Sequence, residues 1–441
     1  MTICEKNDCT GCLSCVGVCP CGAISIRRDA LGFSFPVIDK LKCIECGLCK
    51  KNCHIVTPII DENSVKEVYA AWHNDNAIRM KSTSGGAFSA IAEYVLSENG
   101  CVIGASFDDH FAVKHIIIDN NKDLEKLRGS KYIQSDTENL SKSVLEQLVD
   151  GRKVLLSGTA CQVASVKRYL SGRNYTGELL TVDIVCHGVG SPLVFEKYLA
   201  EIIREKNSTG IKRFRFRDKY YSWRNPSVHA TYNDGNHYFK SGLIDEMFVG
   251  FNRDIFLRES CYHCRYTSID RVSDITLSDF WGYLGTNEMM DDDRGVSMIM
   301  INSSKGQESL KKIQKNITCV KQTLEDAKRG QPCLLHPTPR PKERTQFEND
   351  VYKSMSELRD VYFSPWWRYS TFYFYRGTHE RNRVCKKRMR AVFRALDGIS
   401  LRLHNRERVN KLVFGHYEKH TGIADLSLKA NLDKQNEREM R

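Results

Sequence analysis

The sequence predicts a mixed α/β, or α+β, body with a small cysteine-rich module in front of it and a basic helical extension behind it. Three observations lead to this fold class. Residues 1–58 carry eight cysteines in two copies of one pattern, an internal repeat of about thirty residues. From residue 65 helix and strand signals alternate, and after about residue 332 the strand signals stop. The predicted domains are 1–58, 65–150, 151–332 and 333–441.

Length and composition place the chain among globular proteins. It has 441 residues, of which 41% are hydrophobic and 27% are charged, so it can form two or three domains with their own cores. No run of about 18 apolar residues is present, and the N-terminus leads into Cys4 and Cys9 without an apolar leader. We therefore expect a cytoplasmic protein without a transmembrane segment, whose 18 cysteines serve metal or redox chemistry rather than disulfides.

The middle region opens with a predicted helix. Ser82-Thr83-Ser84-Gly85-Gly86 precedes an apolar stripe at Phe88, Ile91 and Val95, which fits one helix face and closes near Gly100. Apolar runs and alternation then predict strands at 101–107 and 112–119, a helix at 138–149, and buried strands at 154–156 and 180–185.

The second half of the middle region continues the mixed pattern. Ser191-Pro192 supplies an N-cap and a first-position proline, the usual start of a helix. Alternation at 212–217 and the turn residues Asn233-Asp234-Gly235 predict antiparallel strands and a hairpin. After residue 332 the pattern becomes basic and helical, with aromatic residues from Trp366 to Phe374.

The two copies of the cysteine pattern depend on each other for ligands. The first is Cys9-x2-Cys12-x2-Cys15-x3-Cys19-Pro20, and the second is Cys43-x2-Cys46-x2-Cys49-x3-Cys53. Three cysteines at this spacing wrap one [4Fe–4S] cubane, and the fourth ligates the cluster of the other copy. The spacing predicts two clusters, one on Cys9, Cys12, Cys15 and Cys53 and one on Cys43, Cys46, Cys49 and Cys19. Zinc is the weaker alternative, because tetrahedral zinc sites do not need a crossed fourth ligand.

This arrangement resembles the two-cluster bacterial ferredoxins. It departs from them at His54, which stands where the second copy often has a proline. Because His54 follows a ligand, we expect it to tune the cluster rather than to bind it. Cys4 and Cys21 are left over, and we interpret them as structural.

Four further cysteines predict a third cluster site. Cys161 and Cys186 each follow a predicted buried strand, at the carboxyl end where open α/β sheets bind ligands. Taken alone, each would more often be an inert core thiol. Cys261 and Cys264 form a CxxC pair that needs two more ligands or a redox role, and Cys161 and Cys186 provide those ligands.

Six motifs in order resemble the coenzyme F-420 hydrogenase/dehydrogenase beta-subunit family. They are Ser82-Thr83-Ser84-Gly85-Gly86, Lys131-Tyr132-Ile133-Gln134-Ser135, Gly158-Thr159-Ala160-Cys161-Gln162, Cys186-His187-Gly188, Cys261-Tyr262-His263-Cys264 and the segment 273–282. The resemblance covers about residues 65–332 and implies a body that binds FAD beside a [4Fe–4S] cluster. The chain departs from the family at Ala160, where proline is usual, and at Ser278, where glycine is usual.

The expected flavin contacts combine this resemblance with local chemistry. Small residues at helix and strand ends let a ligand approach the backbone, and a helix N-terminus offers free N–H groups. On this basis Ser84, Gly85, Gly86, Gly158, Thr159, Gln162 and Gly188 are candidate flavin contacts. An ordinary capped helix explains the first three equally well. Lys131 is a candidate partner for the pyrophosphate or the flavin ring, with a solvated lysine as the equal alternative.

Two residues are candidates for proton transfer. Flavin hydride chemistry usually requires a proton to move as well, and His187 and Asp279 are the titratable residues inside the motifs. A turn or capping role explains Asp279 at least as well.

The sequence therefore predicts an iron–sulfur flavoprotein oxidoreductase. The resemblance implies ferredoxin or another low-potential carrier as the electron partner, and a small molecule or the deazaflavin coenzyme as the substrate. Some bacterial members resemble reductases encoded with surface-polysaccharide pathways. The alternative is an electron-transfer adaptor that serves a partner enzyme and holds no substrate, and a zinc-stabilised scaffold fits the cysteines poorly.

The net charge of +12 is concentrated near the C-terminus. Residues 361–411 contain 13 Lys and Arg against 3 Asp and Glu, and no nucleic-acid motif accompanies them, so we expect no nucleic-acid partner. One predicted helix holds Arg381, Arg383, Lys386, Lys387, Arg388, Arg390 and Arg394. Its self-repulsion predicts an acidic protein such as ferredoxin, or the anionic face of a membrane, as its partner. A solvated extension is the alternative.

Overall fold

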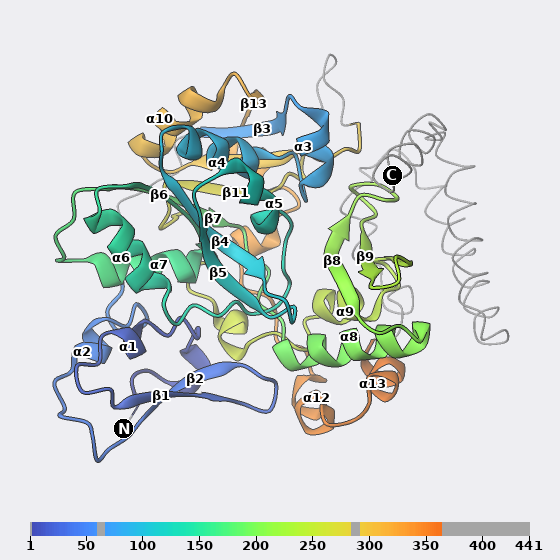
Figure 1. Cartoon of the computed structure of the whole chain (residues 1–441), viewed down its shortest axis with the longest axis horizontal. Coiled ribbons are helices and arrows are strands. Elements are labelled where there is room, and N and C mark those ends of the chain that lie inside the picture. The colour runs from blue at the N-terminus through green and yellow to red at the C-terminus, as the bar shows by residue number, and fades with distance from the viewer. Residues whose placement is uncertain (1, 60–66, 284–291, 364–441) are drawn as a thin grey trace. The chain divides into compact units, whose positions relative to one another are not determined.

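The computed structural model of the chain describes residues 2–59, 67–283 and 292–363 (Figure 1). The chain divides into two compact units, Met1–Trp366 and Trp367–Arg441. The second unit lies outside the described residues, and so do the predicted basic helix and the aromatic residues from Trp366 onward.

The first 59 residues form two short helices and a hairpin. Strands β1 (Ile24–Arg28) and β2 (Ser34–Ile38) pair antiparallel. Helices α1 (Ser14–Gly17) and α2 (Leu48–Lys51) occupy the same place in the two copies of the cysteine repeat. Each follows a left-handed residue, Leu13 with φ 56° or Gly47 with φ 73°, which turns the chain between the second and third cysteines of its copy. The repeat is therefore present in the backbone as well as in the sequence.

An eight-stranded mixed sheet forms the centre of the body, in the order β13-β3-β12-β11-β7-β6-β4-β5. Its strands are β3 (Glu67–His73), β4 (Cys101–Phe107), β5 (Val113–Ile118), β6 (Lys153–Thr159), β7 (Glu178–Ile184), β11 (Ile275–Asp279), β12 (Ser297–Ile301) and β13 (Ile317–Gln322). Strands β4, β6, β7 and β11 run parallel to one another, and the other pairs are antiparallel. The mixed α/β class and the strands predicted before residue 186 are confirmed.

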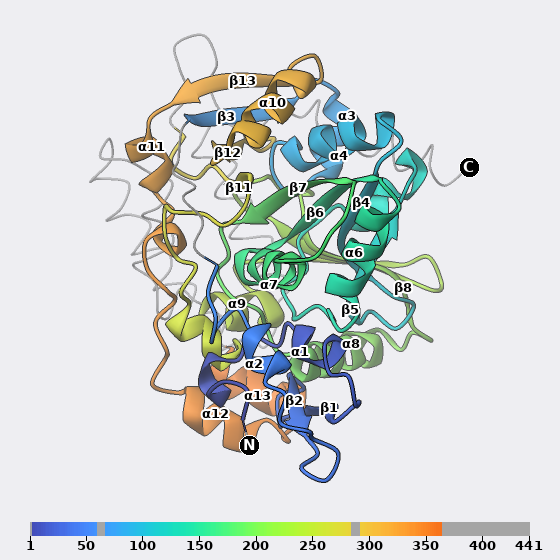
Figure 2. The same cartoon turned by 90° about the vertical axis from the view of Figure 1, so that its left-hand side faces the viewer.

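Helices cover both faces of this sheet (Figure 2). Helices α4 (Ala87–Ser97) and α10 (Ser304–Ile313) pack on one face, where they share a core with Leu155 and Leu180. Helices α6 (Leu140–Val149) and α7 (Ala160–Leu170) pack on the other face with Leu156. Leu155 and Leu156 separate in this way because successive strand residues point to opposite faces. The carboxyl ends of the parallel strands lie along one side of the sheet, which we call its carboxyl edge. The candidate site lies there.

A second, three-stranded sheet packs beside the first. It contains β8 (Ile211–Asp218), β9 (Ser227–Tyr232) and β10 (His237–Ser241), all antiparallel. The predicted turn at Asn233-Asp234-Gly235 joins β9 to β10, with Gly235 at φ 82°. The predicted N-cap is also confirmed, since the Ser191 hydroxyl accepts a hydrogen bond from the Val194 N–H at 3.1 Å at the start of α8 (Pro192–Lys206).

An aromatic core joins this sheet to α8 and to the last described helices. Helices α9 (Glu246–Asn252), α12 (Arg344–Asp350) and α13 (Met355–Tyr362) contribute Phe251, Phe347 and Tyr362 to it. Residues up to Phe363 therefore belong to the folded body, and the extension begins later than the predicted residue 333. The short helices are α3 (Asn76–Lys81), α5 (Leu124–Leu127), α11 (Leu324–Lys328), η1 (Lys6–Asp8), η2 (Asn121–Asp123), η3 (Glu259–His263) and η4 (Pro332–Leu334). No helix in the described ranges is long and apolar enough to cross a bilayer.

Candidate functional site

Cysteines from both copies of the repeat face one cavity in the N-terminal module. Cys9, Cys12 and Cys15 come from the first copy, and Cys53 comes from the second copy. This is the set that crossed ligation assigns to the first cluster, and we call it the first set. Cys4, which sequence reasoning left out, lines the same cavity, and its hydrogen bonds lower the pKa values of Cys9 and Cys53.

The second set lies near the surface of the module. Burial raises the pKa of Cys49, and the charges of Cys46 and Cys19 raise it further. Cys43 opens the same copy three residues before Cys46. The Ala23 N–H donates a hydrogen bond to the Cys19 sulfur at 3.3 Å, and the Cys46 side chain is exposed.

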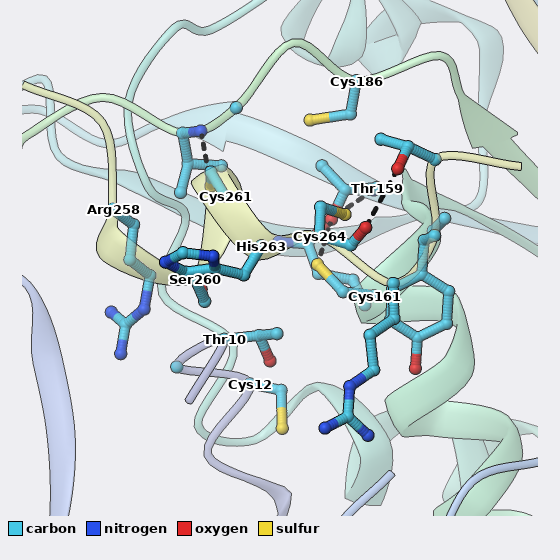
Figure 3. A pocket seen from close by; sticks show the side chains of 18 of the residues that line it. Thr10, Cys12, Thr159, Cys161, Cys186, Arg258, Ser260, Cys261, His263 and Cys264 are labelled. Carbon is cyan, nitrogen blue, oxygen red and sulfur yellow. Dashed lines mark hydrogen bonds between the residues drawn. The ribbon is translucent and has the colours of Figure 1, made fainter. Parts of the chain in front are cut away.

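The four cysteines of the middle region, the third set, face one cavity at the carboxyl edge of the large sheet (Figure 3). Cys161 lies in the first turn of α7 after β6, Cys186 follows β7, and Cys261 and Cys264 lie in and after η3. The cavity has a volume of about 60 Å³. Organic ligands usually occupy pockets of roughly 300–1,000 Å³, so this cavity suits a compact inorganic group.

The protein surroundings alone disfavour thiolates in the third set. Burial raises the pKa of Cys161 to about 12 and that of Cys261 to about 11, and it raises the pKa values of Cys186 and Cys264 as well. Charges on the other members of the set raise the pKa values of Cys161, Cys186 and Cys261 further. Four thiolates can therefore share this cavity only around a positive charge, which iron ions supply.

The four cysteines of the third set line one cavity, an arrangement that suits a cubane. Within the described ranges, no three or more His, Cys, Asp or Glu side chains have the geometry of a single-ion site. In a cubane each thiolate binds a different iron, so the sulfurs surround a cavity instead of meeting at a point. Hydrogen-bond donors already face two of them: the Val189 N–H lies 3.4 Å from the Cys261 sulfur, and the Thr159 hydroxyl lies 3.1 Å from the Cys161 sulfur.

The cavity of the first set contains a polar atom without a partner. Asn52 is 7% exposed and lines this cavity, and its Nδ2 amide has no hydrogen-bond acceptor among the described residues. A buried donor without an acceptor is unfavourable. The sulfurs of a cluster would provide that acceptor, so the residues present fit such a group.

The cavities of the first and third sets share part of their walls. Thr10, Cys12 and Ile55 line both cavities, and Figure 3 shows Cys12 below the cysteines of the third set. Body residues hold this wall in place. The buried Arg258 side chain donates to the Cys9 carbonyl at 2.7 Å, and the Thr137 hydroxyl donates to the Cys12 carbonyl at 3.1 Å.

His187 lies in the wall of the third-set cavity. Its Nε2 atom is 2.5 Å from the Asp254 carboxylate, and its Nδ1 atom is 3.5 Å from the Cys333 sulfur. Burial lowers the pKa of His187, but the hydrogen bonds and charges of Asp254 and Cys333 together outweigh burial and raise the pKa to about 9. The imidazole therefore has both an anionic partner and a sulfur neighbour beside the four cysteines.

Asp279 ends strand β11 at the same edge but does not line that cavity. Its carboxylate pairs with Arg217 and accepts a hydrogen bond from the Trp223 indole at 2.7 Å. The structure therefore does not bring Asp279 together with His187. Its predicted role in proton transfer stays a prediction, and its contacts are those of a structural ion pair.

The glycines before α4 have a packing role. A Cβ atom on Gly85 would lie 2.2 Å from the Ala71 carbonyl oxygen of β3, so only glycine fits between the helix and the sheet. Gly86 adopts φ +94° at the helix N-cap, and the Lys219 ammonium holds the Ser84 carbonyl at 2.6 Å. The flavin contacts predicted for Ser84, Gly85 and Gly86 stay a prediction.

The amine of Lys131 is engaged by backbone carbonyls. It donates to the carbonyl oxygens of Ala105, Lys126, Leu127 and Arg128 at 2.9–3.2 Å, three of which belong to α5 or follow it directly. Burial lowers the pKa of Lys131 to about 7. In this conformation the amine donates to carbonyls at the end of α5, and its predicted contact with a cofactor phosphate or ring stays a prediction.

The end of β6 holds the other predicted flavin contacts. The Gln162 side chain accepts a hydrogen bond from the Thr159 N–H at 2.8 Å and packs on Gly158, while Thr159, Gln162 and Gly188 line the third-set cavity. Two buried atoms near Gly158 lack partners among the described residues. They are Nε2 of His115 and Oδ1 of Asp183, which pairs with Gly158 in the sheet register. Both atoms are enclosed by the protein, and neither residue lines the third-set cavity.

Sequence reasoning missed four residues of this region. Asp254 and Cys333 flank His187, Asn52 faces the first set, and Tyr266 lies between the first and third sets. Asp254, Cys333 and Tyr266 lie outside the motifs, so tertiary contact alone reveals them. Asn52 had a weak signal, because it precedes a predicted ligand.

Comparison with known proteins gives the family. Residues 68–142 match the family model for the N-terminal part of the coenzyme F-420 hydrogenase/dehydrogenase beta subunit, and residues 151–327 match the model for its C terminus. Together the two matches cover more than half of the chain. The chain belongs to this family. The cysteines of the third set, His187 and Asp279 all lie in the part that matches the C-terminal model.

Two known proteins are similar to this chain in sequence. One subunit of the F(420)H(2) dehydrogenase of Methanosarcina mazei is 22% identical over 286 residues, which is 60% of this chain and 74% of the relative. An uncharacterised protein of Methanocaldococcus jannaschii is 24% identical over 207 residues, 38% of this chain and 55% of the relative. A chain of the F-420-reducing [NiFe] hydrogenase complex of Methanosarcina barkeri aligns with TM-score 0.41 and 18% identity, over 68% of this chain and 94% of that chain.

Proposed function

We propose that this protein is an iron–sulfur flavoprotein oxidoreductase that passes electrons between ferredoxin-type [4Fe–4S] clusters and FAD. Its substrate would be a small molecule or a deazaflavin coenzyme, which it reduces or oxidises. One observation carries the proposal: two four-cysteine sets from different parts of the chain face cavities that share Thr10, Cys12 and Ile55. Redox groups held so close together favour electron transfer over a separate structural role for each.

The chain's own residues would hold three clusters. The first set is Cys9, Cys12, Cys15 and Cys53, the second is Cys43, Cys46, Cys49 and Cys19, and the third is Cys161, Cys186, Cys261 and Cys264. Such clusters supply one-electron transfer at potentials set by burial, charge and hydrogen bonds to sulfur. The third set has two such hydrogen bonds, from Val189 and Thr159.

The flavin would lie along the carboxyl edge of the large sheet, outside the small cysteine cavity. The small residues Gly158, in β6, and Gly188, after β7, support this position, because glycine lets a ligand approach the backbone. Thr159, Gln162 and Gly188 are nearby contacts, and Ser84, Gly85, Gly86 and Lys131 are kept from the family resemblance. When bound, the flavin links one-electron to two-electron chemistry. His187, held by Asp254, is the residue best placed to hold a proton near it, and Asp279 is the second candidate.

An electron carrier and a larger enzyme are the proposed partners. A ferredoxin or another low-potential protein would exchange electrons with the N-terminal clusters. The relative from Methanosarcina mazei is a dehydrogenase subunit by name, so this chain is also proposed to associate with another enzyme. We keep the cytoplasm as the proposed compartment, with peripheral membrane contact through the C-terminal tail as an alternative to carrier binding.

An electron-transfer adaptor without its own substrate is the second candidate function. The pairing of Asp279 with Arg217 and Trp223 favours it, because that carboxylate does not face the cavity beside His187. An adaptor would serve another enzyme, such as one in surface-polysaccharide synthesis.

Stepwise reduction of anaerobically purified full-length protein tests the proposal. Reduced ferredoxin should bleach the cluster absorbance first and the flavin absorbance second. Cys186→Ser should keep the fast cluster phase and slow the flavin phase strongly, whereas Cys319→Ser, a change in the edge strand β13, should alter neither. Flavin reduction at the wild-type rate in Cys186→Ser would remove the third set from the path.

A further inference from the structure

Exposed apolar side chains lie beside three cysteines of the second set in the sequence. Leu41 is 98% exposed, Ile44 is 65% exposed and Leu48 is 42% exposed. They alternate with Cys43, Cys46 and Cys49 along one short segment, and the Cys46 side chain is itself exposed. Large apolar residues gathered on a surface mark sites of protein interaction.

The same segment carries a positive charge. Residues 39–51 contain four exposed lysines, Lys40, Lys42, Lys50 and Lys51, against two exposed acids, Asp39 and Glu45. An apolar centre with charged residues around it is the usual composition of a protein–protein interface. Because positive charge attracts negatively charged partners over a distance, this surface favours an acidic protein.

We propose that residues 39–51, which we call the carrier surface, dock a small acidic one-electron carrier protein. This rests on the proposed function, since it requires a cluster on the second set. One electron leaves the reduced carrier, which is oxidised, and reduces the group held by Cys43, Cys46, Cys49 and Cys19. No bond is made or broken and no proton moves. The exposed Cys46 side chain lies within the proposed contact.

Two variants of the full chain test the carrier surface. Ile44→Ser removes an apolar contact, and the double variant Lys42→Glu/Lys50→Glu reverses the charge. Each should slow reduction by an acidic two-cluster ferredoxin at least several-fold at low salt, and the double variant should also lose the steep salt dependence of the wild type. Lys142→Glu, on the exposed side of α6, is the matched control and should behave as the wild type.

Reduced methyl viologen separates this proposal from the proposed function. As a small molecule it does not need the docking surface, so all variants should accept its electrons at the wild-type rate and contain the wild-type amount of iron. Wild-type rates with ferredoxin in both variants would overturn the carrier surface. A wild-type protein that viologen reduces but ferredoxin does not would also overturn it and leave the clusters in place. If neither reductant acts, the proposed function itself fails.

A different observation indicates that the two N-terminal clusters differ in reduction potential. Asn52 precedes Cys53 by one residue, and the equivalent position in the first copy, before Cys19, is Val18. The Nδ2 amide of Asn52 is buried in the first-set cavity without an acceptor among the described residues, and the Cys4 thiol lies in the same cavity. The residue that matches Cys4 in the second copy is Ile38. The first set therefore has two extra donors, and the matched positions Val18 and Ile38 have none in their side chains.

We infer that Asn52 and Cys4 donate hydrogen bonds to the sulfurs of the first cluster and give it a higher reduction potential than the second. Donors that face sulfur stabilise the more negative, reduced form. A cubane has four irons and the first set already supplies four cysteines, so Cys4 keeps its proton as a weak S–H donor. An electron that enters at the carrier surface would then pass to the cluster of the first set. The cavity of that set borders the cavity of the third set.

A redox titration followed by electron paramagnetic resonance tests this order in the intact, iron-loaded protein. Asn52→Leu should retain its iron, lower the potential of one N-terminal cluster and narrow the gap between the two. Asn52→Gln, which keeps an amide, should restore part of the gap, and Val18→Leu should change neither cluster. If Asn52→Leu loses iron, Cys4→Ala tests the inference instead. This variant should lower the reduction potential of the first cluster and keep its full iron content. Unchanged potentials in an iron-replete variant, or loss of iron in Cys4→Ala, would overturn the inference.

Discussion

The Nδ1 atom of His54 lies 2.5 Å from the hydroxyl oxygen of Tyr266, and this contact joins the N-terminal module to the loop that carries Cys264. His54 is 2% exposed, and its Nε2 atom lies 3.0 Å from the Thr10 hydroxyl. Tyr266 lines the third-set cavity and interacts electrostatically with Cys12 and Cys53 as well as with Cys161. The pair therefore lies between the first and third cysteine sets and fixes one relative to the other.

Removing this hydroxyl should loosen the module from the body. Tyr266→Phe leaves the buried Nδ1 atom of His54 without a partner, at a cost of about 1–3 kcal/mol. Hydrogen exchange should then become faster in residues 2–59. Tyr262→Phe is the matched control, because its hydroxyl donates to the Asp254 carbonyl within the body at 2.5 Å. Equal exchange in the module for both variants would contradict the role of the pair.

Gly85→Ala should destabilise the body with or without flavin. The new Cβ atom would lie 2.2 Å from the Ala71 carbonyl oxygen, and overpacking of this kind costs roughly 1–3 kcal/mol. Thermal unfolding should show the same decrease in Tm for flavin-free and flavin-loaded protein. Gly17→Ala, where no atom lies within 4 Å of the added carbon, should change the Tm little. A decrease confined to the flavin-loaded protein would make Gly85 a cofactor contact instead.

Lys131 should make the free energy of unfolding depend on pH between about 7 and 10.5. Burial lowers its pKa from 10.5 to about 7, so between these values the unfolded chain binds more protons at this amine than the folded chain does. The free energy of unfolding should therefore rise with pH from about 7 to 10.5, relative to Lys131→Met. The variant should also lose about 1–3 kcal/mol, because four carbonyls lose their donor. Denaturant titrations at several pH values would show the difference in slope, and parallel slopes would contradict it.

Deleting the C-terminal extension should spare the cofactors. Phe363 is buried in the aromatic core, so the deletion should begin at residue 364. All three cysteine sets lie in the first unit, and the truncated protein should keep its iron and flavin. Because residues 361–411 carry most of the net charge, ferredoxin reduction should become slower at low salt and less sensitive to added salt. A truncated protein as fast as the full chain, with neither form binding anionic vesicles, would assign no docking role to the extension.

Local sequence signals predicted the elements that local chemistry determines. The apolar run at 101–107 became β4, the turn at Asn233-Asp234-Gly235 joined two strands, and Ser191-Pro192 began α8. The cysteine spacing also predicted groupings that depend on the repeat, because ligand geometry restricts which residues can meet. These features require only neighbours in sequence or a known ligand.

The remaining features depend on contacts between distant segments. Asp254 reaches His187 from 67 residues away, and Gly85 is glycine because β3 passes beside it. The sequence suggested a cofactor contact for Lys131, which stays a prediction, but it gave no sign that the amine also donates to backbone carbonyls such as those of Ala105 and Arg128. Single-sequence reasoning cannot distinguish a functional lysine or glycine from a structural one when the deciding contact is tertiary.

Iron content tests the assignment of twelve cysteines to three clusters. Anaerobically purified full-length protein should contain about twelve iron atoms per chain, and Cys261→Ser and Cys19→Ser should each lower this number by about four. A content near eight that Cys261→Ser leaves unchanged would contradict the third cluster. A content near zero after reconstitution would contradict the account as a whole.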